Sequence, residues 1–70
     1  MVLLWDIEWI DDNGTPLEQQ RHLTEETARL QAQRWLKSQP GSRVYLYRRR
    51  GETSVLVQVL TVVPHTCPDS

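Results

Sequence analysis

The chain has 70 residues, of which 39% are hydrophobic and 24% are charged, and its formal net charge is −1. A chain of this length forms one small domain with a marginal core, which argues against a multistep enzyme. It contains no apolar run long enough to cross a membrane and no secretory leader pattern, and its single cysteine cannot form an internal disulfide. These features favour a cytoplasmic protein.

Charge is distributed unevenly along the chain. Residues 1–26 hold seven acidic residues and one arginine, whereas residues 27–70 hold seven basic residues and two acidic ones. Two interpretations follow. The two halves pair with each other across a sheet, or the surface presents one acidic and one basic face to partners.

The first predicted element is a strand over residues 2–10, because apolar and polar residues alternate there. This alternation places Trp5 and Trp9 on one face. Asp6 and Glu8 lie on the other. The Asn13-Gly14 pair then predicts a hairpin turn, and residues 17–23 form a polar return strand that suits a sheet edge.

A helix is predicted over residues 25–38. Thr24 has the residue type of an N-cap, and two glutamates follow it in the first turn. Ala28, Ala32, Trp35 and Leu36 recur at helical spacing and form one narrow apolar stripe. Pro40-Gly41 ends the helix.

Two more strands are predicted, over residues 43–49 and 54–63. The second is apolar on both faces, with Val55, Val57 and Val59 on one face and Leu56 and Leu60 on the other. Such a strand is normally central in a sheet. Pro64 ends it, and residues 65–70 are expected to be a disordered tail.

The order β-β-α-β-β predicts an α+β fold, in which a four-stranded antiparallel sheet carries one helix on one face. We expect a single domain over residues 1–64, with the last strand in the interior of the sheet. One helix leaves the opposite face of the sheet uncovered, which predicts a homodimer or a protein partner there. The alternative is that arginine stems and tyrosine rings cover that face.

Residues with the potential for chemistry are sparse. His22, His65 and Cys67 do not have the spacing of a zinc site, and no group is placed to activate Cys67 as a nucleophile. The pairs Asp6/Glu8 and Asp11/Asp12 lack a cleft and are interpreted as solvated carboxylates. The sequence therefore predicts no catalytic activity, no metal site and no bound cofactor.

The candidate binding residues lie around the third strand. Arg48, Arg49 and Arg50 are expected at a hairpin tip, next to Tyr45 and Tyr47. Arginine contacts phosphate well and tyrosine stacks on bases, which allows a nucleic-acid-binding module. Three arginines neutralise only a few phosphates, however, so a protein partner is preferred. Asp6 and Glu8 would then provide an acidic counterpart.

The opening pattern, with Trp5, Trp9, Asp11 and Gly14, and the pattern from Leu23 to Leu36 resemble small accessory proteins of phages and mobile elements. The layout of residues 2–63 is similar to that of some anti-CRISPR proteins, and to the arm-binding domains of phage integrases. The resemblance assigns no functional residue. It implies a small non-catalytic protein-binding module, concretely a phage-type inhibitor of a host defence complex; the alternative is a nucleic-acid-binding module.

Overall fold

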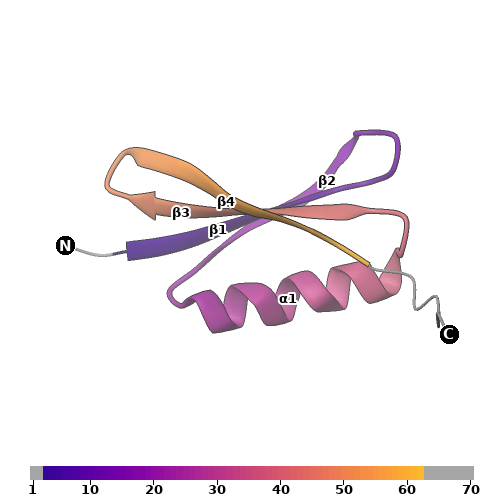
Figure 1. Cartoon of the computed structure of the whole chain (residues 1–70), viewed down its shortest axis with the longest axis horizontal. Coiled ribbons are helices and arrows are strands. Elements are labelled where there is room, and N and C mark those ends of the chain that lie inside the picture. The colour runs from indigo at the N-terminus through magenta and orange to yellow at the C-terminus, as the bar shows by residue number, and fades with distance from the viewer. Residues whose placement is uncertain (1–2, 63–70) are drawn as a thin grey trace, which may run out of the picture.

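The predicted element order is confirmed by the computed structural model, which describes residues 3–62. One antiparallel sheet carries one helix on one of its faces, which is the α+β arrangement expected (Figure 1). The elements are β1 (Leu3–Ile10), β2 (Pro16–His22), α1 (Glu25–Ser38), β3 (Arg43–Arg50) and β4 (Thr53–Thr61). The predicted tail over residues 65–70 lies outside the described residues, as do His65 and Cys67.

The sheet order is β2-β1-β3-β4, so the prediction of an interior last strand is wrong. β1 pairs with β2 on one side and with β3 on the other, which leaves no free side for β4. β4 instead follows β3 through a tight turn in which Gly51 has a φ of +63°, and the short turn keeps the two strands side by side. β4 is therefore an edge strand, like β2.

A β-bulge changes which residues of β4 share a face. Leu46 lies opposite Gln58 whereas Tyr47 lies opposite Leu56, so Val57 is an extra residue in the ladder. An extra residue reverses the alternation beyond it. Val55 therefore shares a face with Leu60, and the faces predicted from strict alternation are wrong for this strand.

The helix begins and ends as predicted. The hydroxyl of Thr24 accepts a hydrogen bond from the backbone N–H of Thr27 at 3.2 Å, which caps the first turn. Glu25 and Arg29 form an i,i+4 ion pair at 2.8 Å. At the other end, the backbone N–H of Gln39 donates to the carbonyl of Trp35.

The core lies between α1 and the two interior strands. Its fully buried strand residues, Ile7, Val44 and Leu46, meet the predicted apolar stripe of the helix. Trp5 and Trp9 pack partly buried against this cluster, so both belong to the core side of the sheet. The indole N–H of Trp9 donates to the hydroxyl of Ser42 at 2.8 Å, and this bond satisfies the polar end of the ring.

The hairpin turn between β1 and β2 is organised by a carboxylate. Oδ1 of Asp11 accepts hydrogen bonds from the backbone N–H groups of Asn13 and Thr15, at 2.9 and 2.8 Å. Gly14 has a φ of +89°, a conformation that glycine adopts without strain. Asp11 therefore has a structural role in the turn, beyond that of a solvated carboxylate.

Candidate protein-binding face

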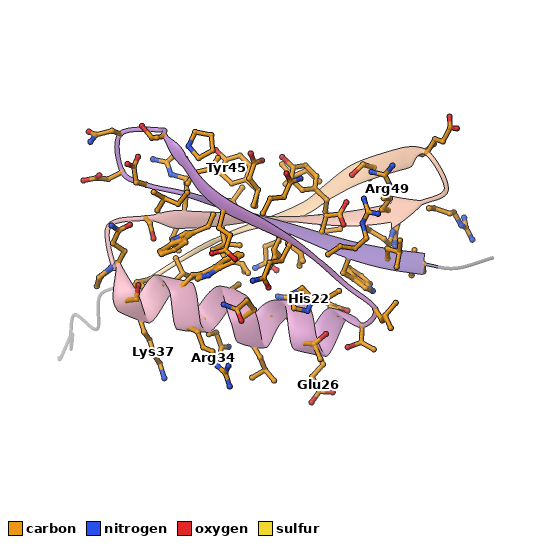
Figure 2. All side chains as sticks on the ribbon, turned by 180° about the vertical axis from the view of Figure 1, so that it is seen from behind. His22, Glu26, Arg34, Lys37, Tyr45 and Arg49 are labelled. Carbon is orange, nitrogen blue, oxygen red and sulfur yellow. The ribbon has the colours of Figure 1, made fainter. Side chains whose placement is uncertain are left out.

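Strand register divides the seven candidate residues between the two faces of the sheet. Five of them, Asp6, Glu8, Tyr45, Tyr47 and Arg49, lie on the face that α1 does not cover, which we call the helix-free face. Figure 2 shows the labelled Tyr45 and Arg49 on the side of the sheet opposite the helix. Arg48 and Arg50 alternate with them and lie on the other face.

Asp6 is the most buried polar residue of the helix-free face, with a side chain only 8% exposed. Its Oδ1 accepts a hydrogen bond from Nε of Arg21 at 3.0 Å, and its Oδ2 lies 3.8 Å from Nη1 of Arg49. The two arginines come from strands on either side of β1. Asp6 is therefore held in an ion-pair network that spans three strands, and this network also orders Arg49.

Tyr45 and Tyr47 lie directly opposite the two acidic residues, since Glu8 pairs with Tyr45 and Asp6 with Tyr47. Both tyrosines are partly buried. Burial raises the pKa of the Tyr47 phenol, and the charge of Glu8 and the neighbouring Tyr45 raise it further. Tyr47 therefore stays protonated at neutral pH, as a hydrogen-bonding aromatic group.

An apolar margin from β4 adjoins the two tyrosines. In the ladder, Leu56 lies opposite Tyr47 and Val59 lies opposite Tyr45. These aliphatic side chains are 47% and 43% exposed, respectively. Tyr45, Tyr47, Leu56 and Val59 thus form a strip of aromatic and aliphatic groups, called the aromatic strip below, with Asp6, Glu8 and Arg49 along one side.

Arg48 and Arg50 belong to a different surface. Together with Leu3, Thr53 and Val55, they line an open hollow of about 370 Å³ on the helix-bearing face. The β3–β4 hairpin extends past the N-terminal end of α1, so the helix leaves this hollow open (Figure 1). Neither arginine forms an ion pair with any residue from 3 to 62. The three consecutive arginines therefore do not act as one cluster.

Sequence reasoning missed Arg21 as the partner of Asp6 and missed the exposure of β4. The first was not accessible from the hairpin turn alone, because a register shift between Trp9 and Ile10 separates the turn from the Asp6–Arg21 pair. The expected pairing between the acidic and basic halves of the chain across the sheet occurs in Asp6–Arg49, whereas Glu25–Arg29 joins the two halves within the helix. The exposure of β4 had no local signal, since it depends on the strand order.

Within the described part of the chain, no three His, Cys, Asp or Glu residues are grouped so as to hold a metal ion. No helix there is long and apolar enough to cross a membrane. Comparison of the chain with protein-family models, with curated proteins and with solved structures finds no match.

Proposed function

We propose that this chain is a non-catalytic protein-binding module and that the aromatic strip is its contact surface. The observation that carries the proposal is the position of Tyr45 and Tyr47 beside exposed aliphatic groups of β4, on a face without a covering helix. Protein interfaces are enriched in tyrosine and arginine, with polar groups at the rim. Glu8 and Arg49 supply charges of both signs at that rim.

The ion-pair network supports this role because it orders a side chain of the proposed contact surface before a partner binds. Arg49 is only 33% exposed and lies beside Asp6 in the free chain. A side chain that is already ordered loses less conformational entropy on binding than a free one. The proposed partner therefore presents an apolar patch with polar groups that meet Glu8 and Arg49.

The separation of the arginines favours a protein over a nucleic acid as the partner. A nucleic-acid surface would need the arginines and the tyrosines together on one face. Arg48 and Arg50 lie on the opposite face from the tyrosines. The arginines that pair with Asp6 on the tyrosine face, Arg21 and Arg49, flank its carboxylate. The more specific proposals, an inhibitor of a host defence complex and a cytoplasmic location, rest on the layout of the chain and on its composition.

A photo-crosslinking experiment tests the proposed face. A benzophenone amino acid replaces Tyr45 in one variant and Leu30 in a control, because Leu30 is 52% exposed on the outer side of α1. In cells of the source organism, position 45 should capture a protein that position 30 does not. Excess unlabelled wild-type chain should compete with this capture, and excess Tyr47→Ala chain should compete much less well.

Equal capture from positions 45 and 30 would contradict the proposal. A captured species that disappears on nuclease treatment, and whose yield falls steeply with salt, would instead identify a nucleic acid. In that case the Arg48→Ala and Arg50→Ala variants should reduce the yield further. Under the proposal, these two variants leave the capture at position 45 unchanged.

A further inference from the structure

β4 has the composition of an interior strand and the position of an edge strand. Eight of its nine residues are exposed, seven of them in an unbroken run from Thr53 to Val59, and only Leu60 is half-buried. Four consecutive or nearly consecutive aliphatic residues, Val55, Leu56, Val57 and Val59, are each between 43% and 48% exposed. The helix lies mainly over β1, β2 and β3. It reaches β4 at Gln58, whose Oε1 accepts a hydrogen bond from Nη1 of Arg29 at 3.0 Å, and it leaves the four aliphatic residues exposed.

The two edges of the sheet differ in the features that prevent pairing with another chain. β2 begins with Pro16 and carries Glu18 and Arg21, and charges and prolines of this kind discourage edge-to-edge association. β4 contains no charged residue and no proline over its whole length. Only one edge of the sheet is therefore open to a further strand.

We propose that β4 pairs with β4 of a second copy of this chain, in antiparallel orientation about a two-fold axis. An uncharged aliphatic strand is its own chemical complement, since antiparallel self-pairing opposes no like charges. The two four-stranded sheets then join into one sheet of eight strands, with both helices on the same face. β4 becomes an interior strand in this dimer, and its exposed aliphatic side chains gain cross-strand neighbours from the second copy.

The bulge divides β4 into two segments, Thr53–Leu56 and Gln58–Thr61, each of which keeps a regular register with β3. The proposed axis passes through the second segment. Opposite residues of a ladder share a face, so the two-fold axis must pass at a residue and not between two residues. We place it at Val59, which is exposed, whereas its neighbour Leu60 already packs against the core. The two copies of Val59 then lie with their Cβ atoms about 5 Å apart.

This dimer forms through the backbone edge of β4. Val59 belongs both to this edge and to the aromatic strip, whereas Tyr45 and Tyr47 lie one strand in and stay available to the proposed protein partner. It also differs from the homodimer predicted from the sequence, which uses the helix-free face. The two kinds of dimer respond differently to a charge on β3. Tyr45 lies one strand in from the edge, on the same face as Val59, so a charge at Tyr45 disturbs a face-to-face dimer and leaves an edge-to-edge dimer intact.

The test is the native mass of the full chain, measured by light scattering at tens of micromolar. The wild type should have twice the chain mass of 8.2 kDa. Val59→Lys should reduce the mass to that of one chain, because it brings two ammonium groups face to face. Tyr45→Lys and Gln19→Lys, which introduce the same charge on the helix-free face and on the β2 edge, should leave the dimer intact.

A mixing experiment keeps the test independent of folding defects in a single variant. Val59→Lys and Val59→Glu should each be monomeric, and an equal mixture of the two should recover the dimer mass. In the Val59→Lys monomer, backbone amides of Val57–Thr61 should exchange with solvent faster than in the wild type, while those of β1 should not change. A monomeric wild type, or dissociation by Tyr45→Lys or Gln19→Lys to the same extent as by Val59→Lys, would overturn the proposal.

Discussion

The ring of Trp9 on β1 stacks on the ring of Trp35 on α1, with centroids 5.3 Å apart and planes inclined by 2°. This contact fixes the C-terminal half of the helix against the interior of the sheet. The indole N–H of Trp9 also donates to the hydroxyl of Ser42, which lies in the segment between α1 and β3. The Ser42 hydroxyl in turn donates to the carbonyl of Gln39 at 2.6 Å. The stacked pair thus connects three parts of the chain.

Replacing Ser42 by alanine should lower the free energy of unfolding by about 1 kcal/mol, because the partly buried indole N–H of Trp9 loses its acceptor. Urea denaturation of the four members of a double-mutant cycle measures this. In a Trp9→Phe background, where no indole N–H remains, Ser42→Ala should have a smaller effect. An equal loss in both backgrounds would assign the effect of Ser42 to its bond with Gln39.

Replacing Arg21 by alanine should lower the free energy of unfolding by about 1–2 kcal/mol, because the buried carboxylate of Asp6 keeps only the more distant Arg49. The loss stays below that of a fully buried pair because the Arg21 side chain is 55% exposed. Arg48→Ala is the matched control and should change stability by less than about 0.5 kcal/mol. Thermal unfolding of both variants measures the two losses of stability, and equal losses would contradict the assigned ion-pair network.

Stability should fall as the pH rises above about 10, the usual pKa of a tyrosine phenol. The folded chain holds the pKa of Tyr47 above that value, so between the unfolded and the folded pKa the folded state retains a proton that the unfolded state has lost. Phenolate absorbance in a Tyr45→Phe variant follows Tyr47 alone. Glu8→Gln should lower this pKa only in part, because burial is the larger cause and remains.

Replacing Thr24 by alanine should destabilise the chain by about 1 kcal/mol, because the N–H of Thr27 loses the side-chain oxygen that caps the helix. Thr24→Ser keeps that oxygen and should restore most of the stability. Circular dichroism during thermal unfolding compares the two variants. A Thr24→Ser chain as unstable as Thr24→Ala would show that the methyl group of Thr24, and not its hydroxyl, carries the effect.

The elements and their order were accessible from the sequence because the local signals agree with the tertiary structure. Thr24, Glu25 and Arg29 lie at the N-terminal end of α1, and the apolar stripe that ends at Leu36 needs only helical periodicity. The strand order was not accessible in this way. Apolar residues on both faces of β4 predict an interior strand, but such a pattern does not indicate which strands lie beside it.

The sequence did not predict how the candidate binding residues are distributed between the two faces of the sheet. Arg48, Arg49 and Arg50 were expected together at a turn, but β3 continues to Arg50 and its alternation sends the middle arginine to the opposite face. The pairing of Asp6 with Arg49 depends on β1 lying next to β3, a long-range contact. Strand termini and long-range neighbours are the features that a local pattern does not encode.

The extra residue in β4 gives the strand an unusual tolerance to a change in length. The registers on either side of Val57 are those of an uninterrupted ladder, with Leu56 opposite Tyr47 and Gln58 opposite Leu46. Removing Val57 would therefore close the ladder without turning any other side chain to a new face. A one-residue deletion at Ile7 would instead reverse the alternation of side chains in half of β1, so that either Asp6 or Trp9 would move to the opposite face of the sheet. Among natural variants of this sequence, changes in length should accumulate at position 57 and be absent from β1.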